Sequence, residues 1–397
     1  MAITSAFTNI ATTTRASKAW DGGAWDFVSG SAVGALVEYA ANAPRVTSSG
    51  LLVEEASTNE IRNPRFEGAT VGVIGSGGVA PTNMTIDGYS TTVEIVALSS
   101  EGGWPYIDVK FSGTPTQDID IKMEDTTTVS AAQSEDWTLS VGLKLVAGDL
   151  TNITAVNVRM VERDAGSFKA AGSVAVTPDS TNKRSFFSRT LTHADTDAVQ
   201  PYLTLDWDGS GAVDITLRVY APQLEQKAYP TSPVLPTAGA PQASTRNGDD
   251  ITVAAGSWLG SAHTIYADIT PTSIGSFEYW LTLSDGTTSN TIAMGQASSF
   301  RCLMVAGGVT QVAAGAGAVA VGTAIKHAIC VDANDVAISV NGQTQLYDTS
   351  VTVPTVTELQ LGAYANASAQ FPGLYIADFR YWPRRLTNAE LEALVGN

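Results

Sequence analysis

The sequence predicts a mainly β protein, made of an N-terminal arm, two antiparallel β-sandwich domains and a short C-terminal α-helix. Three observations support this fold class. Only 15% of the 397 residues are charged, whereas the small and β-branched residues typical of sandwiches with many turns are abundant. Apolar and alternating runs recur at strand length, and helical periodicity is nearly absent. The length suffices for two or three domains that each bury a core of their own.

The segment 50–68 (GLLVEEASTNEIRNPRFEG) marks the end of the arm and the start of the first domain. Its apolar run, Leu51 to Val53, gives way to polar residues, and Asn63-Pro64 starts a new turn. Residues 1–56 are therefore predicted to form an attachment arm. The arm holds too little apolar material for an independent core. It docks either onto another protein or onto the first sandwich of its own chain, and the sequence favours neither alternative.

Two sandwich domains follow the arm. Residues 57–237 contain strand-like runs at short spacing. A proline-rich connector comes next and ends at residues 238–244, since a sheet centre does not accept such a density of prolines. Residues 245–397 form the second predicted domain.

The second domain carries two local signals. Asn341-Gly342 separates two strand-like runs and predicts a hairpin, because both central residues of a type I′ turn need a positive φ. Near the C-terminus, Thr387 and Glu390 stand at the N-cap and N3 positions of a capping box, which predicts the start of a helix.

Three stretches resemble known families. The phrases TRAS, APRV and GLLVEEASTN of the arm resemble segments of bacteriophage-type virion proteins. Residues 61–68 and 219–233 resemble the two ends of carbohydrate-binding-module-like jelly-roll domains. The ending, FPGLYIADFRYW followed by RLTNAEL, resembles the closing strand and helix of concanavalin A-like, laminin-G-like lectin domains. These resemblances imply two lectin-like sandwiches on a tail-fibre-like or spike-like appendage.

Charge and composition exclude several classes of partner. The net charge is −17, which disfavours nucleic acid because binding to phosphates depends on basic residues. No basic amphipathic helix points to a membrane surface, and the uncharged run 304–325 is rich in Gly and Ala, which favours strands over a membrane span. The first residues lack the features of a secretory signal. Cys302 and Cys330 are expected to be buried free thiols.

The sequence shows no catalytic motif, and we expect no enzyme activity. The Glu-x-Asp-x-x-Glu strand motif of catalytic concanavalin A-like proteins is missing. The nearest acidic strand, Gln117 to Glu124, is interpreted as a solvated sheet face. The histidines, His193, His263 and His327, lie in no metal-binding pattern and are expected to be structural.

A partial calcium-loop pattern occurs near residue 210. Asp206, Asp208, Ser210 and Asp214 copy the early ligand spacing of such a loop, in which glycines permit a sharp turn. Leu217 stands where an EF-hand has its bidentate Glu. An ordinary acidic turn is the favoured interpretation, and calcium is the alternative. No other cofactor is predicted.

Aromatic residues are the remaining functional signal, because sugar rings stack on Trp and Tyr beside polar groups that orient hydroxyls. Trp104, Tyr106 and Asp108 alternate near a Gly-rich turn and form the first candidate glycan site. Tyr364 and Asn366 form the second. The alternative for Trp104 is a place in the core.

The resemblances imply a non-enzymatic structural and adhesion component of a phage or phage-like particle. Its expected partners are host surface polysaccharide and other virion proteins, and it is expected to be a homo-oligomer on the virion surface, assembled in the host cytoplasm. Two alternatives stay open: a polysaccharide depolymerase of the glycoside hydrolase type, and a purely structural decoration or connector protein.

Overall fold

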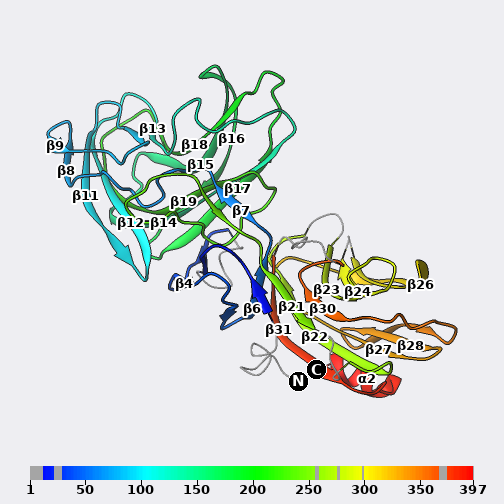
Figure 1. Ribbon diagram of the computed structural model, residues 1–397. Helices are drawn as coiled ribbons and strands as arrows, with labels where there is room; N and C mark the ends of the chain where they lie inside the picture. The colour runs from blue at the N-terminus through cyan, green and yellow to red at the C-terminus, as the bar shows by residue number, and fades with distance from the viewer. Residues whose placement is uncertain are drawn as a thin grey trace. The chain divides into compact units, whose positions relative to one another are not determined.

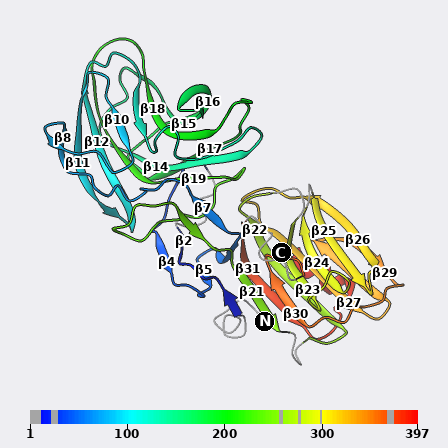
Figure 2. The ribbon, with the colours of Figure 1, turned by 45° about the horizontal axis from the view of Figure 1, so that its top comes forward.

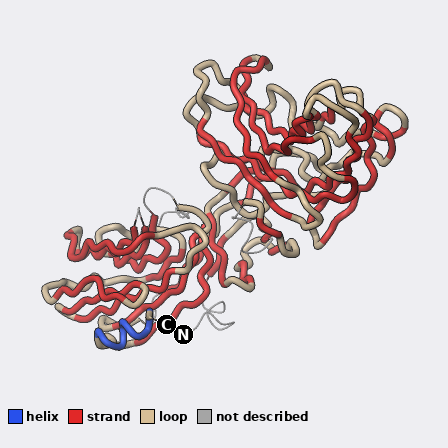
Figure 3. Tube along the Cα trace, turned by 180° about the vertical axis from the view of Figure 1, so that it is seen from behind, coloured by secondary structure: helices blue, strands red, loops and turns tan. Residues whose placement is uncertain are grey.

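A computed structural model describes residues 12–21, 29–254, 259–274, 278–296, 299–365 and 373–396. Figure 1 shows that antiparallel strands make up nearly all of this part of the chain, and Figure 3 shows the short helix α2 near the C-terminus. The predicted mainly β fold class is confirmed. By its internal contacts the chain divides into two compact units, each built from separate stretches of sequence.

The central unit comprises Ala19–Glu38 and Ser57–Arg246. It is a sandwich of a five-stranded and an eight-stranded sheet, drawn in blue to green in Figure 2. The five-stranded sheet contains, in order, β10 (Thr85–Asp87), β13 (Ile119–Lys122), β18 (Ala198–Trp207), β15 (Ile153–Asp164) and β16 (Ser167–Val176). The eight-stranded sheet contains β3 (Ser31–Ala32), β17 (Lys183–Thr190), β14 (Asp136–Gly148), β19 (Val213–Glu225), β12 (Trp104–Gly113), β11 (Thr92–Glu101), β8 (Gly72–Ile74) and β9 (Gly77–Gly78).

Strict alternation builds the core of this sandwich. Ile119 and Ile121 on β13, or Val156 and Val158 on β15, point inward, while the polar residues between them point outward. There are also two short two-stranded sheets in the described part of the chain. One pairs β7 (Ser57–Asn59) with β20 (Ser244–Arg246), and the other pairs β2 (Ala19–Asp21) with β4 (Val37–Tyr39).

The C-terminal unit comprises Met1–Lys18, Tyr39–Ala56 and Asn247–Asn397. It is a sandwich of two seven-stranded sheets. One contains β1 (Thr12–Thr14), β21 (Asp250–Ala254), β30 (Glu358–Leu361), β23 (Glu278–Ser284), β24 (Thr291–Gln296), β25 (Ser299–Ala306) and β26 (Val309–Ala318). The other contains β29 (Gln343–Asp348), β28 (Asp335–Val340), β27 (Ile325–Asp332), β22 (His263–Pro271), β31 (Gly373–Trp382), β6 (Gly50–Glu54) and β5 (Arg45–Thr47).

The local signals of this unit are confirmed. Asn341 and Gly342 both have positive φ and join β28 to β29. Thr387 caps α2 (Asn388–Val395) in a complete capping box with Glu390, and the helix buries Leu391 and Val395 against the outer side of β22, β27 and β28. Cys302 and Cys330 are buried free thiols. Among the described residues, no helix is long and apolar enough to cross a membrane.

The N-terminal segment 1–56, predicted as one arm that docks onto another protein or onto the first sandwich, is divided between the two units. β1, β5 and β6 extend the sheets of the C-terminal unit, whereas β3 pairs with β17 of the central unit and Trp20 joins a cluster there. Counting apolar residues within this segment could not show the division, because backbone hydrogen bonds to distant strands hold it. The predicted start of the second domain, residue 245, lies close to the division after Arg246.

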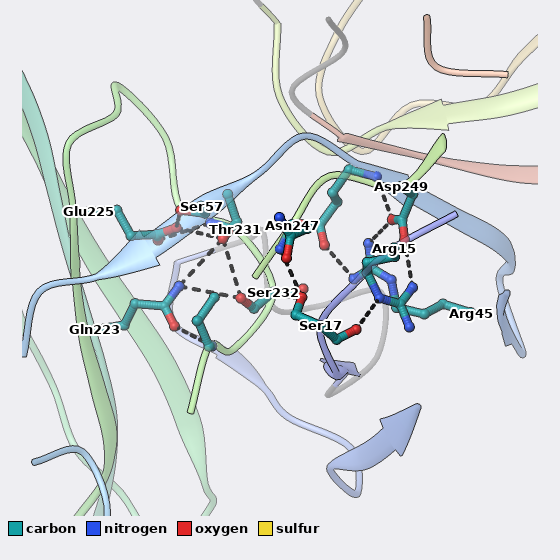
Figure 4. A network of polar contacts seen from close by, with 12 residues as sticks. Arg15, Ser17, Arg45, Ser57, Gln223, Glu225, Thr231, Ser232, Asn247 and Asp249 are labelled. Atoms are coloured by element: carbon teal, nitrogen blue, oxygen red, sulfur yellow. Dashed lines mark hydrogen bonds and ion pairs between the residues drawn. The ribbon is translucent and has the colours of Figure 1, made fainter. Parts of the chain in front are cut away.

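A buried ionic cluster holds the N-terminal strands in the C-terminal unit. Arg15 Nη1 lies 2.6 Å from Asp249 Oδ1, and Arg45 binds both Asp249 and Glu54. Figure 4 shows the two arginine side chains converging on Asp249. All four side chains are inaccessible to solvent or nearly so. Such a cluster fixes the position of its strands, because breaking a buried pair leaves an uncompensated charge.

Candidate functional site

Trp104 is a core residue and not an exposed platform. Its side chain is 2% exposed and packs with Trp20, Tyr220 and Leu235. Its indole Nε1 donates a hydrogen bond to the carbonyl oxygen of Gly34 at 2.8 Å. The expected exposure is therefore wrong, because the segment that contains Gly34, which is distant in the sequence, covers the Gly-rich turn.

Tyr106 and Asp108 lie on the outer side of the eight-stranded sheet, in a closed polar network. The guanidinium of Arg218 lies 3.6 Å from the centroid of the Tyr106 ring and donates two hydrogen bonds to Asp108, at 2.6 and 2.8 Å. Asp108 is only 3% exposed. We call this surface the eight-strand outer face; it comprises Glu101, Tyr106, Asp108, Lys144, Arg218 and Tyr220.

Glu101 completes the network of the eight-strand outer face. It accepts hydrogen bonds from Lys144 (3.0 Å), from Tyr220 (2.9 Å) and from Arg218. Burial raises the pKa of Glu101, but these hydrogen bonds outweigh it and lower the pKa to about 2. The polar groups that were expected to orient a sugar thus bind one another.

The second candidate site lies in the C-terminal unit. The ring of Tyr364 stacks on that of Tyr279 with centroids 4.5 Å apart and planes at 24°. Tyr279 is buried while Tyr364 is half-buried, and burial together with Tyr364 raises the pKa of Tyr279 to about 12. Asn366 lies outside the described residues. Of this candidate site, the structure therefore describes only the partly accessible ring of Tyr364, which stacks on the buried ring of Tyr279.

The calcium-loop residues have separate partners. Asp206 accepts a hydrogen bond from Asn157 (2.8 Å), Asp208 accepts from the backbone and hydroxyl of Ser210, and Asp214 pairs with Lys110 at 3.1 Å. In the described ranges, no group of three or more His, Cys, Asp and Glu could hold a metal ion. The favoured acidic turn agrees with this geometry, because Asp208 closes the turn on its own backbone.

A polar and aromatic surface that sequence reasoning missed lies on the outer side of the five-stranded sheet. The register places Asp120 beside Thr204, Thr204 beside Asn157, and Tyr202 beside Arg159. Phe168 stands opposite Arg163 across a bulge. We call this surface the five-strand outer face; it comprises Tyr89, Asp120, Lys122, Asn157, Arg159, Arg163, Phe168, Ser173, Tyr202, Thr204 and Asp206.

Aromatic rings are distributed across the five-strand outer face. Phe168, on the edge strand β16, is 56% exposed. Tyr202, on the central strand β18, is nearly buried between Lys122 and Arg163, whose charged groups lie 5.7 and 5.9 Å from its ring centroid. Tyr89 is half-buried beside β10 at the other edge. The face therefore offers accessible rings at its two edges, while the ring at its centre is covered.

The centre of the five-strand outer face carries planar polar groups. Asp120 accepts hydrogen bonds from Thr204 (2.8 Å) and Tyr89 (3.4 Å). Burial raises the pKa of Asp120, against the opposing effects of Thr204, Lys122 and Arg159. The charge of Arg159 acts on both Asp120 and Asp206, yet this half-buried residue has no hydrogen-bond partner among the described residues. Its donors are available to a ligand.

The prediction that the acidic strand Gln117 to Glu124 is a solvated sheet face is only partly correct. Asp120 and Lys122 do point outward, but they are half-buried and hydrogen-bonded. Glu124 lies beyond the end of β13, is buried, and accepts hydrogen bonds from the backbone and side chain of Arg62 at 2.6 to 2.9 Å. The signal that could have found the face was the alternation of Asp118, Asp120 and Lys122 with isoleucines.

Comparison with known proteins supports the C-terminal fold. Residues 245–392 match the family model described as the concanavalin A-like lectin/glucanases superfamily. No curated protein matches the chain. Among solved structures, it is similar to the carbohydrate-binding module CBM40 of a Ruminococcus gnavus sialidase bound to α2,3 sialyllactose, with 16% identity, a TM-score of 0.31, and coverage of 34% of this chain and 83% of that one.

Two further solved structures are similar. Domain 4 of an extracellular arabinanase from Geobacillus stearothermophilus, in complex with arabinotriose, has 14% identity, a TM-score of 0.31, and coverage of 43% of this chain and 83% of that one. A tandem CBM22 from Paenibacillus barcinonensis has 13% identity, a TM-score of 0.28, and coverage of 80% and 95%. Likeness at this level says nothing about the ligand. The sheets form two β-sandwich units, and the family match shows that the C-terminal unit includes a concanavalin A-like, laminin-G-like domain.

Proposed function

We propose that the protein binds glycans without cleaving them, and that the five-strand outer face of the central unit is its contact surface. The observation that carries the proposal is the guanidinium of Arg159, which lies among aromatic rings and oriented carboxylates with its donors uncommitted. No Arg159 nitrogen is among the buried side-chain atoms without a partner in the described part of the chain, so water reaches them and a ligand can take the place of that water.

The chemistry of a sugar matches this surface. The apolar C–H side of a sugar ring stacks on Phe168 or Tyr89, and its hydroxyl groups both donate and accept hydrogen bonds. Arg159 supplies donors, Asp120 and Asp206 supply acceptors, and Asn157 supplies both. Thr204 and Tyr89 fix the orientation of Asp120, which reduces the entropy lost on binding.

The strand order sets the direction and reach of the bound chain. From Tyr89 beside β10 to Phe168 on β16, the five strands span about 19 Å at the usual spacing of about 4.8 Å. A ligand that contacts both edges therefore crosses the strands and extends over several sugar units. We propose an oligosaccharide or polysaccharide as the ligand and not a single sugar.

Binding to a mutated face is the direct test. Arg159→Ala should weaken binding to host envelope polysaccharide by about tenfold or more, as expected for a charged hydrogen-bonding group at the centre of a site. Lys110→Ala is the matched control, because Lys110 is a partly exposed cation on the opposite sheet. Isothermal titration of both variants and the wild type measures the difference. Equal affinities for all three would overturn the proposal.

One observation favours a second candidate, a polysaccharide depolymerase. Burial raises the pKa of both Asp120 and Asp206, the direction that a general acid needs. We place binding first because Asp120 accepts hydrogen bonds from two hydroxyl groups, an arrangement suited to the ionised form. Release of reducing ends from the polysaccharide, lost in Asp120→Asn, would establish the depolymerase.

We further propose that the protein works on the surface of a phage or phage-like particle, as a homo-oligomer joined to other virion proteins. This part of the proposal rests on the resemblance of the N-terminal phrases TRAS, APRV and GLLVEEASTN to virion proteins. Labelling of the chain in images of an assembled particle tests it. A location inside the particle would leave the glycan-binding face without access to a host surface and would contradict an adhesion role.

A further inference from the structure

A cavity of about 290 Å³ opens between the two sheets of the central unit, at the edge where β16 faces β17. Leu143, Val174 and Val176 form an apolar floor, and Thr177, Lys183 and Ser185 contribute polar groups. Ser29 and Gly30 border it and are held to β17 by hydrogen bonds to Phe186 and Arg184. This cavity lies on the inner side of the sandwich and is separate from the five-strand outer face.

Ser185 distinguishes this cavity from a packing defect. Its side chain lines the cavity, is only 3% exposed, and forms no hydrogen bond with any described residue. The Ser185 oxygen is not among the buried side-chain atoms that lack a partner in the described part of the chain, so it is accessible from the cavity and water can solvate it. A valine or alanine would pack against Leu143 and Val174 without this polar atom, so the hydroxyl gives the apolar cavity a group that can bond a polar atom of a ligand.

The charge at the opening restricts the ligand. Lys183 Nζ lies 2.5 Å from Asp179 Oδ2, so the ammonium group is already neutralised and gives no net attraction for an anion. The floor is apolar, and the hydroxyl of Ser185 can donate one hydrogen bond and accept others. An engineered cavity of about 150 Å³ holds benzene, which means that this one accommodates a ligand of about ten non-hydrogen atoms.

We propose that this cavity binds a small neutral amphipathic molecule, with an apolar body on Leu143, Val174 and Val176 and a hydroxyl or carbonyl group on Ser185. The site is independent of glycan binding on the outer face. Ligand binding here also ties β16 to β17 and closes the open edge of the sandwich, so occupancy should raise the melting temperature of the protein through preferential binding to the folded state.

Phenol and toluene are matched probes, because they share size and shape and differ by a hydroxyl in place of a methyl group. Affinities of both are measured by ligand-observed NMR titration with the full chain, for the wild type and for Ser185→Ala. In the wild type both probes should bind. In Ser185→Ala the ratio of phenol to toluene affinity should fall by about two- to tenfold, the usual worth of one hydrogen bond, while toluene binding is retained.

A second variant tests the location. Val174→Phe fills the cavity and should abolish binding of both probes, whereas Val146→Phe, at an exposed position on β14, should leave both affinities unchanged. Circular dichroism melting confirms that each variant is folded. Absence of binding of both probes to the wild type, an unchanged affinity ratio in Ser185→Ala, or retained binding in a folded Val174→Phe would each overturn the proposal.

Discussion

The two outer faces of the central unit carry similar residues and differ at one arginine, which is hydrogen-bonded on one face and has no hydrogen-bond partner among the described residues on the other. Both combine tyrosines, arginines and acidic residues on alternating positions of long strands. On the eight-strand outer face, Arg218 is bonded to Asp108 and Glu101 and stacks on Tyr106. On the five-strand outer face, Arg159 has charged neighbours and no hydrogen-bond partner among the described residues.

The comparison teaches that residue type does not identify a binding face. A network whose donors and acceptors are all paired stabilises the fold, and a ligand would have to break it. A face that keeps one arginine with uncommitted donors can bind a ligand without breaking such a network. Arginine substitutions should therefore differ in the stability they cost. The loss should be larger the more completely the arginine is buried and paired.

Arg45 gives the largest expected effect, as a fully buried member of an ion-paired cluster. Its side chain is 0% exposed and binds Glu54 and Asp249, which are themselves buried. Arg45→Ala should destabilise the C-terminal unit by about 3 to 5 kcal/mol, because two buried carboxylates lose this guanidinium and Asp249 keeps only that of Arg15. Denaturant unfolding measures the change. A loss below about 1 kcal/mol would show that water or a rearranged Arg15 replaces the guanidinium.

Trp104→Ala should produce a similar loss in the central unit, about 3 to 5 kcal/mol, since it leaves a cavity beside Trp20 and Tyr220. Trp104→Phe, which keeps most of the apolar volume, should lose less. Thermal melting and binding of host polysaccharide are measured on the same samples. Weakened binding by a variant of unchanged stability would return Trp104 to the candidate site.

Arg218→Ala should cost about 3 kcal/mol, at the low end of the range for buried pairs, because the side chain is 14% exposed. The substitution removes the two hydrogen bonds that Arg218 donates to Asp108. Arg218→Lys should recover only part of the loss, because a lysine cannot make the bidentate contact. Arg159→Ala should change stability by no more than about 0.5 kcal/mol. Equal destabilisation by Arg218→Ala and Arg159→Ala would remove the difference between the two faces.

The sequence predicts the fold further than it predicts the site. Strand patterns, the Asn341-Gly342 turn and the Thr387 capping box are local features, and each is encoded by residues within a few positions of one another. The division of the segment 1–56 between the units is not local. β6, near the start of the chain, pairs with β31, close to its C-terminus, and nothing in the composition of the segment specifies that partner.

The candidate site was missed for the same reason. The alternation around Asp120 is visible in the sequence, but its neighbours Thr204 and Arg159 come from two other strands, and only the register of the sheet brings them together. For Trp104 the error is the opposite one, since the sequence suggests a surface residue and the structure buries it. Its Gly-rich surroundings indicate exposure, while the chain around Gly34 that covers it comes from a distant segment.

The smallest expected effect is the pH dependence of stability. One acidic residue on each outer face, Glu101 and Asp120, should change the free energy of unfolding in opposite directions as the pH rises. The pKa of Glu101 is lowered to about 2, from an unfolded value of about 4.3. The ionised form of Glu101 therefore contributes stability above pH 4.3, and this contribution is lost as the pH falls toward 2. The pKa of Asp120 is raised. Its contribution has the opposite sign, because stability is highest while Asp120 is protonated and falls as the pH rises above its ordinary value of about 3.9.

Melting temperatures between pH 2 and 7 for the wild type, Glu101→Gln and Asp120→Asn test this pair of signs. Glu101→Gln should reduce the loss of stability on acidification below pH 4.3, and Asp120→Asn should remove a loss that appears as the pH rises from about 4. Each effect should be at most about 1 kcal/mol, because Glu101 is 38% exposed and solvent screens its ion pairs. If both variants altered the pH profile in the same direction, the two faces would share one electrostatic character, and the uncommitted state of the five-strand outer face would lose its support.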